Sequence, residues 1–335
     1  MPGKRIRRIS VVAPMVDEAE HVESLVADLA AQDFDGELEI IVADGRSTDG
    51  SAARLRAAAQ RTGLDVTVLD NPHRSAAAGL NRCIARATGD LIVRLDCHAS
   101  YPPDFLRRCA LASEETGAWN VGGILTARGR TPTERAVACA YDSPFGGIAW
   151  TRHLGRTDRV EVDLVHYGAF RPEVLERVGG YDEGLVVGEV EDLCERIREA
   201  GGTVVYDPAI RLYYVPRGSY RGVFVQYYRY GLWKVAAMAK HGRVLSARSM
   251  VPVLFVASAA GLGAASTRSR PARRLLAVEL AAYGLGGTLF ALAAVRGRRE
   301  EPRLVPRVLG VFATFHLAHG LGQLHGWARQ LRRSL

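Results

Sequence analysis

The chain has 335 residues, of which 48% are hydrophobic and 24% charged, and its formal net charge is +8 at pH 7. This length accommodates one large domain or two ordinary ones, and the apolar content is enough for a folded core. Much of the excess positive charge lies beside apolar runs in the C-terminal part, and no basic stripe is interleaved with aromatic residues. The charge therefore indicates a membrane surface rather than nucleic acid.

The five cysteines are scattered and show no Cys-x-x-Cys spacing, so we expect neither a disulfide framework nor a zinc site, and we expect a reducing compartment. The N-terminal basic residues precede only a very short apolar run that ends at Pro14. This run is too short for a signal peptide.

Short apolar runs alternate with amphipathic segments over the first 100 residues. The pattern predicts strands over residues 9–13, 38–43, 65–69 and 91–95, and helices over 18–31, 52–62 and 75–87. Such alternation indicates βαβ units and a mainly parallel α/β sheet. Residues 160–215 are less regular, with a predicted helix over 190–200 and a strand over 203–206.

Three apolar segments follow residue 245. Residues 249–267 and 275–295 are about long enough to cross a bilayer, which takes roughly 20 residues, and 306–324 is marginal. Glu279 would cost about 2.5–3.5 kcal/mol at mid-membrane, which the apolar residues of its segment narrowly offset. We therefore expect two to three transmembrane helices, with a buried helical hairpin of a soluble domain as the alternative.

The predicted domains are an α/β domain over residues 1–220, an amphipathic interfacial segment over 221–246 and a membrane region over 247–335. Three spans would place Arg268 to Arg274 outside the cell, against the positive-inside tendency. A shallow re-entrant hairpin is the alternative.

Asp96 and His98 follow the predicted fourth strand. Residues i and i+2 project from the same face of an extended strand, so both could reach one divalent ion, while Cys97 would face the opposite side. The carboxyl ends of parallel strands are where open α/β sheets bind ligands. Oxygen and imidazole ligands suit a metal that holds a diphosphate, although a polar strand end is the simpler alternative.

Several motifs in order resemble glycosyltransferase family 2. They are Val11-Val12-Ala13-Pro14 with Asp17-Glu18, Asp44 to Gly50, Gly89-Asp90, Asp96-Cys97-His98, His166 to Arg171, Gly179 to Glu183, Glu191-Asp192 with Arg196, and Gln226 to Trp233. The resemblance covers roughly the first 240 residues and is closest to membrane-attached, succinoglycan-type exopolysaccharide transferases. It implies the GT-A fold, a Rossmann-like nucleotide-sugar domain.

The resemblance also implies roles for individual residues. Ala13, Pro14, Glu18 and Asp44 match the nucleoside-binding elements, and Asp96 with His98 matches the Asp-x-Asp that binds Mg²⁺ or Mn²⁺ at the diphosphate. Because His98 replaces an aspartate, the metal's identity stays open. Asp192 matches the catalytic base, although its acidic cluster could instead favour a helix N-terminus. Glu191, His166, Arg171, Gln226, Arg229 and Trp233 match the acceptor side.

The expected function is that of an inverting, metal-dependent glycosyltransferase. It would move a hexose from a nucleotide sugar, such as a UDP-sugar, to a lipid-linked or polysaccharide acceptor at the cytoplasmic face of the cell membrane. Polysaccharide-assembly proteins are possible partners. The alternatives are a polyprenyl-phosphate sugar synthase and a catalytically silent, nucleotide-binding membrane scaffold. No Gly-x-Gly-x-x-Gly follows the first strand, which disfavours a Rossmann dehydrogenase.

Overall fold

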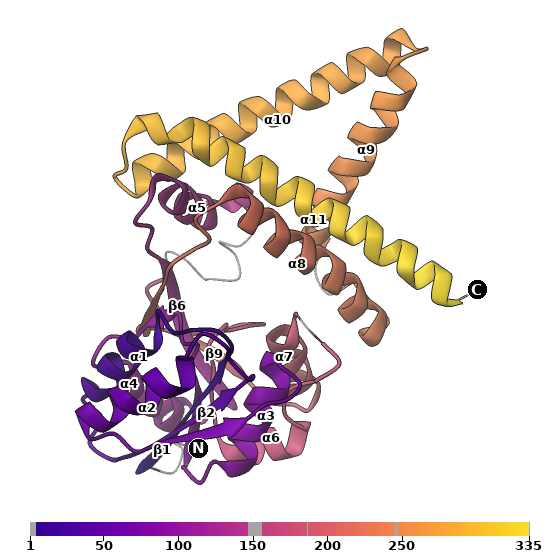
Figure 1. The fold of residues 1–335 in the computed structure, drawn as a ribbon. Coiled ribbons are helices and arrows are strands. Elements are labelled where there is room, and N and C mark those ends of the chain that lie inside the picture. Colours follow the sequence, from indigo (N-terminus) through magenta and orange to yellow (C-terminus); the bar gives the residue numbers. More distant parts are fainter. Residues whose placement is uncertain (1–4, 147–155, 186, 245–246, 335) are drawn as a thin grey trace. The chain divides into compact units, whose positions relative to one another are not determined.

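The structure is a computed structural model that describes residues 5–146, 156–185, 187–244 and 247–334. Its residues group by their contacts into two compact units (Figure 1). The first unit contains Met1–Thr126 and Thr151–Tyr214, and the second contains Ala127–Trp150 and Val215–Leu335. The predicted domain boundary at 220 stays a prediction, and that at 246 falls outside the described residues.

Among the described residues, nine strands form one sheet in the order β3-β2-β1-β4-β8-β6-β9-β5, with β7 also paired to β9. The strands are β1 (Arg8–Met15), β2 (Glu37–Asp44), β3 (Val66–Asp70), β4 (Leu91–Arg94), β5 (Ala99–Ser100), β6 (Asn120–Ala127), β7 (Val160–Glu161), β8 (Ala169–Phe170) and β9 (Val204–Tyr214). The first four strands in this order are parallel. β8 is antiparallel to both β4 and β6, and β9 is antiparallel to β5 and β7.

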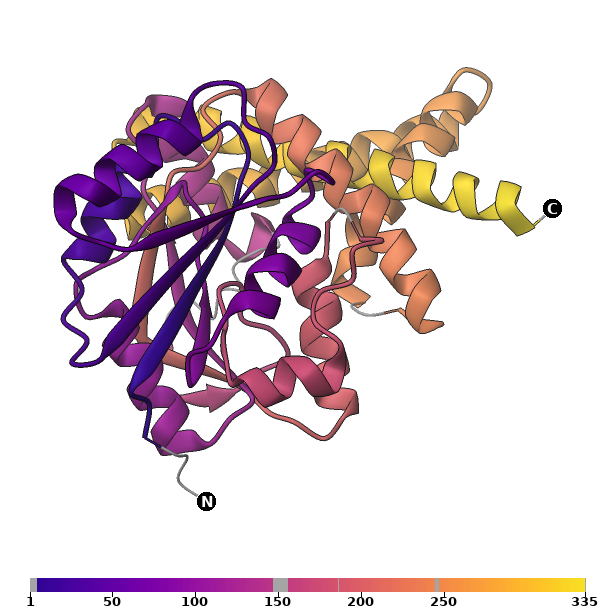
Figure 2. The same cartoon turned by 60° about the horizontal axis from the view of Figure 1, so that its bottom comes forward.

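Helices cover both faces of this sheet (Figure 2). They are α1 (Val22–Ala30), α2 (Ser51–Thr62), α3 (Ala76–Arg86), α4 (Phe105–Thr116), α6 (Pro172–Val178) and α7 (Glu189–Glu199). Alternate residues of β1 face opposite sides, because side chains alternate along a strand. Val11 packs in one core with residues of α1, α2 and α4, and Val12 packs in the other with residues of α3, α6 and α7. The predicted α/β sheet is therefore confirmed.

Most predicted boundaries differ by a few residues, and β9 (Val204–Tyr214) is much longer than the strand predicted over 203–206. Two of the differences affect the candidate site. The first helix begins at Val22 rather than Glu18. Asp17 has a left-handed backbone (φ 53°), and the Glu18 amide donates to Ser51 Oγ (2.7 Å), so this stretch is a turn. The fourth strand ends at Arg94. The expectation that Asp96 and His98 share one face of an extended strand is therefore wrong, because a turn begins after Leu95.

The second unit is helical among its described residues. Its helices are α5 (Pro132–Asp142), α8 (Tyr220–His241), α9 (Val251–Ser266), α10 (Arg270–Gly297) and α11 (Val305–Ser334), with short 3₁₀ helices at Pro144–Gly146, Ala247–Met250 and Pro302–Leu304. Two ion pairs, Arg135–Glu300 and Arg298–Asp142, join α5 to the connection between α10 and α11.

α8 and α11 pack side by side and run in the same direction. Tyr220 Oη donates to the Arg307 carbonyl (3.2 Å), and the Tyr227 ring stacks on Phe315 with centroids 3.8 Å apart. A Cβ at Gly326 would lie 2.9 Å from Val235 Cβ. Because the contacts advance together along both helices, the pair is parallel.

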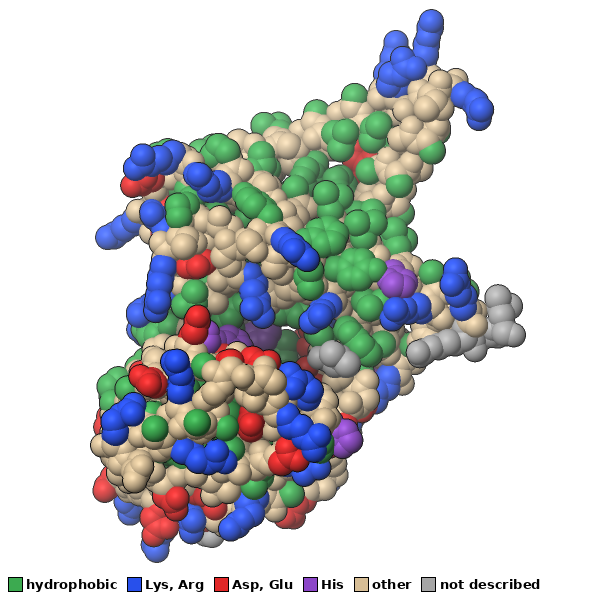
Figure 3. Space-filling view, viewed as in Figure 1, with side chains coloured by type: hydrophobic (Ala, Val, Ile, Leu, Met, Phe, Trp, Pro, Cys, Tyr) green, Lys and Arg blue, Asp and Glu red, His purple; other side chains and the backbone are tan. Residues whose placement is uncertain are grey.

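Three helical stretches are long and apolar enough to cross a membrane: Ala247–Ser266, Arg270–Gly297 and Pro302–Arg332. In the most apolar part of each stretch, only 11% of the first two is buried, against 39% of the third. Figure 3 shows hydrophobic side chains along α9 and α10, with Lys and Arg gathered at the turn that joins them. This exposure contradicts the alternative of a buried hairpin in a soluble domain.

Candidate functional site

The carboxyl ends of β1, β2 and β4 meet at one edge of the sheet. β1 pairs in parallel with both neighbours, so Met15 lies opposite Asp44 and Val12 opposite Arg94. The amide of Leu95, just beyond β4, donates to the Val12 carbonyl (2.9 Å). The edge at which open α/β sheets bind ligands therefore holds the residues predicted for the donor.

Asp44 ends β2, and its carboxylate is fixed by the next turn. Its Oδ1 accepts hydrogen bonds from the Ser47 hydroxyl (2.6 Å) and the Ser47 amide (3.2 Å). The Gly45 amide donates to the Met15 carbonyl (2.8 Å), and a Cβ on Gly45 would collide with Val16 Cγ2. The turn therefore needs glycine here to let the two strand ends approach. Near the carboxyl end of β1, Ala13 is buried and Pro14 is half-buried.

Three residues other than glycine have left-handed backbones around this edge: Asp17 (φ 53°), Arg46 (φ 55°) and Arg74 (φ 54°). They hold one another. Arg74 Nη1 donates to the Arg46 carbonyl (2.9 Å), and Arg74 Nη2 lies 3.4 Å from Asp17 Oδ2. The Thr48 amide donates to Asp17 Oδ1 (2.8 Å). Such strained residues cluster at ligand-binding sites, which supports a functional role for this edge.

The Asp96-Cys97-His98 turn is fixed by Tyr101. The Asp96 amide donates to Tyr101 Oη (2.8 Å), and that hydroxyl donates to the Asp96 carbonyl (3.1 Å). Cys97 is buried, and its thiol contacts the Pro14 carbonyl oxygen (3.7 Å). Burial, with the charges of Glu18 and Asp96, raises the pKa of Cys97 well above its usual value. Cys97 is therefore a buried neutral thiol.

The side chains of the turn are suited to a cation. Asp96 Oδ1 is buried without a hydrogen-bond partner, and the nearest charge is Arg94 Nη2 at 3.5 Å. His98 Nδ1 lies 3.0 Å from Glu18 Oε1, an arrangement in which a carboxylate orients a ligating imidazole. No group of three or more His, Cys, Asp or Glu side chains that could hold a metal occurs in the described ranges. The protein would thus supply only part of a coordination shell.

The first turn of α7 contains Glu189, Glu191 and Asp192. The Asp192 side chain is fully buried, and its Oδ2 accepts from Arg196 Nε (2.8 Å). Arg196 also donates to the carbonyls of Val178 and Gly180. Asp192 therefore helps to attach α7 to the turn after α6. Glu189 instead accepts a hydrogen bond from Arg94 Nη1 (3.3 Å). The other terminal nitrogen of Arg94 contacts Asp96, so Arg94, Asp96 and Glu189 form one cluster at the sheet edge, the Arg94 cluster.

The residues predicted for the acceptor side lie apart along the chain. β8 is antiparallel to β4, and the Arg94 amide donates to the Gly168 carbonyl (3.1 Å). His166 therefore lies toward the carboxyl end of β4. Arg171 follows β8 and lies toward the amino end of β4. Glu191 is in the first turn of α7, and the remaining three are on α8 in the second unit: Gln226, Arg229 and Trp233. Gln226 Nε2 donates to Tyr230 Oη (2.8 Å) within that helix.

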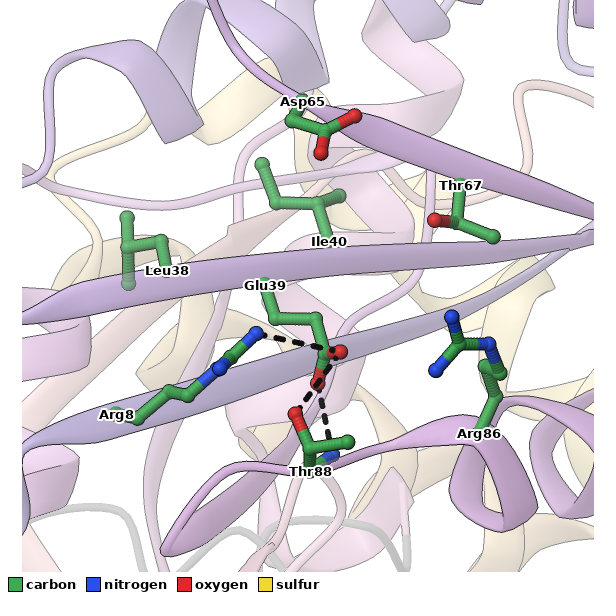
Figure 4. A pocket seen from close by; sticks show the side chains of 8 residues that line it. All are labelled: Arg8, Leu38, Glu39, Ile40, Asp65, Thr67, Arg86 and Thr88. Atoms are coloured by element: carbon green, nitrogen blue, oxygen red, sulfur yellow. Dashed lines mark hydrogen bonds and ion pairs between the residues drawn. The ribbon is translucent and has the colours of Figure 1, made fainter.

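A hollow of about 370 Å³ lies at the opposite edge of the sheet (Figure 4). It is lined by Arg8, Leu38, Glu39, Ile40, Asp65, Thr67, Arg86 and Thr88. Glu39 accepts from Ser10 Oγ (2.5 Å) and from the Thr88 amide (2.8 Å). These contacts join β1, β2 and the segment before β4. The hollow lies by the first residues of the strands and is not part of the candidate site.

Neither Arg94 nor Tyr101 is among the residues predicted for the site. Arg94 lies within the apolar run Leu91 to Leu95, and a charge in a buried strand needs partners. That signal was available in the sequence. Nothing in the sequence around Tyr101 indicates that its hydroxyl returns to the backbone of Asp96.

Comparison with known proteins agrees with this geometry. Residues 10–176 match the family described as "Glycosyl transferase family 2". The succinoglycan biosynthesis protein ExoA of Rhizobium meliloti (strain 1021) is 31% identical over 253 residues, which is 75% of this chain and 76% of ExoA. An undecaprenyl-phosphate 4-deoxy-4-formamido-L-arabinose transferase of Sodalis glossinidius (strain morsitans) is 34% identical over 107 residues, or 31% of this chain and 33% of that protein.

A solved structure shares the fold. It is the mannosyltransferase PcManGT from Pyrobaculum calidifontis in complex with GDP-Man and Mn²⁺, with a TM-score of 0.67 and 22% identity, covering 96% of this chain and 88% of PcManGT. The mixed sheet is thus GT-A-like, as the sequence predicted. The likeness to ExoA extends over most of both proteins, and this chain belongs to glycosyl transferase family 2 and is a glycosyltransferase.

Proposed function

We propose that this chain is an inverting, metal-dependent transferase that moves a hexose from a nucleotide sugar to a lipid-linked or polysaccharide acceptor. Asp96 carries the proposal. Its carboxylate follows β4 at the same sheet edge as Asp44, with one buried oxygen outside any hydrogen bond. The donor we favour is a UDP-sugar. Because the structure of PcManGT contains GDP-Man, a GDP-sugar is the alternative donor to test.

Asp96 and His98 would hold the divalent cation, Mg²⁺ or Mn²⁺. The Oδ1 of Asp96, which makes no hydrogen bond although Arg94 Nη2 lies 3.5 Å away, and the carboxylate-oriented imidazole of His98 fit such an ion, with diphosphate oxygens and water as further ligands. When bound, the cation supplies neutralisation of the charge that develops on the leaving diphosphate.

The strand ends of β1 and β2 would hold the nucleoside. Asp44 presents a carboxylate fixed by Ser47, which is suited to accept hydrogen bonds from a ribose or a base. Ala13 and Pro14 would form the adjacent wall, and Glu18 would orient His98. Because left-handed residues already hold this edge in place, we propose that the pocket is formed before the donor binds.

Inversion requires a base that accepts the acceptor hydroxyl's proton while its oxygen attacks the anomeric carbon and the diphosphate leaves. We assign this role to a carboxylate in the first turn of α7. Asp192 is the candidate from the sequence, but its burial against Arg196 would have to be relieved. Glu189, on the Arg94 cluster, is the alternative, and Glu191 would face the acceptor beside it.

The acceptor would approach from the membrane. We propose a multi-pass protein of the cell membrane in which α9 and α10 cross and the catalytic unit is cytoplasmic, where nucleotide sugars are found. Gln226, Arg229 and Trp233 of α8 would contact the acceptor, as would His166. Arg171 stays a weaker candidate, since its strand directs it toward the amino end of β4. Polysaccharide-assembly proteins would receive the product.

The test uses membranes that contain the chain, radiolabelled UDP- and GDP-hexoses, and lipid extraction. Transfer of label to the lipid fraction that requires Mn²⁺ or Mg²⁺, and is abolished by Asp96→Ala, is expected. Retained activity of Asp96→Ala, or activity in excess chelator, would contradict the metal role. Nucleotide binding without turnover on any acceptor would favour a silent scaffold.

A second candidate acceptor is a polyprenyl phosphate, which the similarity to an undecaprenyl-phosphate sugar transferase favours. Mild acid treatment of the labelled lipid separates the two candidates. A free monosaccharide indicates transfer to the phosphate, and a labelled oligosaccharide indicates transfer to a lipid-linked sugar.

Membrane orientation can be measured with a cysteine at position 270, the first residue of α10, next to the turn from α9. The five native cysteines are buried, so a membrane-impermeant maleimide should label only the new thiol. Labelling of Arg270→Cys from outside intact cells is expected if both helices cross. Labelling only after permeabilisation would support a re-entrant hairpin.

A further inference from the structure

Arg94 is a charged residue in the buried core of the first unit. It ends β4, every residue of which is buried, and is itself only 6% exposed. An unpaired guanidinium at such a place would be strongly unfavourable, so its partners explain its presence. None of the motifs that define the family resemblance includes this residue.

The Arg94 guanidinium lies between two carboxylates from distant parts of the chain. Its Nη2 is 3.5 Å from Asp96 Oδ1, and its Nη1 is 3.3 Å from Glu189 Oε1. The side chains of Asp96 and Glu189 are only 17% and 14% exposed, so solvent screens their charges poorly. Without the guanidinium, two partly buried negative charges would face each other across this space.

Two tyrosine rings complete the surroundings of Arg94. The guanidinium carbon lies 5.6 Å from the Tyr181 ring centroid and 6.0 Å from that of Tyr167, within the range of cation–π attraction. Burial raises the pKa of Tyr181 to about 12, so this ring is neutral at physiological pH. Burial acts to lower the pKa of Arg94, but the charges of Asp96 and Glu189 outweigh it, and Arg94 stays protonated.

We propose that Arg94 is a positioning residue for sugar transfer, which holds the carboxylates of Asp96 and Glu189 at one place and suppresses the repulsion between them. Asp96 thereby stays available at the diphosphate end of the donor, and the first turn of α7 is kept beside it. This inference rests on the proposed function, in which Asp96 binds the cation of a nucleotide-sugar complex.

The experiment measures Mn²⁺-dependent binding of UDP and of GDP to the full chain in detergent, together with transfer activity. Removing a positive charge beside Asp96 would by attraction alone strengthen Mn²⁺ binding. We expect the loss of position to outweigh this, so that Arg94→Met weakens the apparent Mn²⁺ affinity about 10- to 100-fold, as loss of a residue that supports a metal ligand does. Arg94→Lys keeps the charge without the planar fork and should fall between Arg94→Met and the unaltered chain.

The double variant Arg94→Met/Glu189→Gln provides the sharper test. Glu189→Gln removes a negative charge, which by attraction alone would weaken Mn²⁺ binding further. It also removes the repulsion that displaces Asp96 in Arg94→Met, so under the proposal most of the Mn²⁺ affinity should return while transfer activity stays low. A merely structural role for Arg94 predicts no such recovery. The matched control is Arg159→Met, which breaks an ion pair with Asp207 (2.7 Å) elsewhere in the same unit. It should lower the melting temperature and leave Mn²⁺ affinity unchanged.

Unchanged Mn²⁺ affinity in Arg94→Met would overturn the inference. So would an equal loss of affinity in Arg159→Met, or a double variant that binds Mn²⁺ no better than Arg94→Met. If the unaltered chain binds neither nucleotide with Mn²⁺, the proposed function itself fails, and the inference fails with it.

Discussion

Replacing Asp192 with asparagine removes a charge from a side chain that is fully buried against Arg196. The Nε–Oδ2 distance of 2.8 Å marks a charge-assisted hydrogen bond, which contributes about 1.5–3 kcal/mol. Asparagine keeps a carbonyl oxygen for Arg196 but loses the charge, so we expect the free energy of unfolding to fall within that range. For a unit of this size, the melting temperature should fall by roughly 3–12 °C.

The matched variant is Glu189→Gln, whose carboxylate lies on the Arg94 cluster. If Glu189 is the base, turnover should fall about 10²- to 10⁴-fold while nucleotide binding persists. Both variants are compared as full chains in detergent by two measurements. Thermal melts give the melting temperature, and turnover of labelled donor is measured per folded molecule. An unchanged melting temperature in Asp192→Asn, with turnover lost and nucleotide binding intact, would make Asp192 the base and refute this reasoning.

Three further predictions concern stability and reactivity. Burial raises the pKa of Cys83 to about 12 and of Cys194 to about 11, so the folded chain should not react with Ellman's reagent at pH 8; rapid release of one equivalent would contradict this. A Cβ at Gly231 would collide with the His319 carbonyl, whereas Gly284 has open space. In chemical denaturation, Gly231→Ala should therefore destabilise by about 1–3 kcal/mol and Gly284→Ala should not; equal effects would argue against the close α8–α11 contact. Burial acts to raise the pKa of Glu39, but hydrogen bonds from Ser10 and Thr88 hold it below 4.5. Its stabilisation should be complete above pH 4.5 and be lost as pH falls through the lowered value, so the unaltered chain should lose stability on acidification more steeply than Glu39→Gln; parallel curves would exclude this role.

Much of the parallel half of the sheet could be predicted from sequence, because β1, β2 and β4 are apolar runs and their helices have one apolar face. The same half contains Asp96, which the end of a predicted strand indicated as a candidate ligand, whereas the role expected of Asp44 came from the resemblance to the family. The surroundings of Asp192 and Glu189 did not follow. They depend on which face of α7 meets β4 and on the Arg94 contact, and such pairing between distant segments has no local pattern.

The parallel packing of α8 and α11 also constrains the membrane region. α8 contains Arg221, Arg229, Lys234 and Lys240, and the two central cations alone would cost about 5–7 kcal/mol at the bilayer centre. α11 follows α8 over most of α8's length, so both share one inclination to the bilayer. The third apolar helix is thus attached to a helix that is costly to insert. If the chain is inserted in a bilayer, the depth of α11 would therefore depend on its neighbour as well as on its own hydropathy, and a span count from composition alone overlooks this coupling.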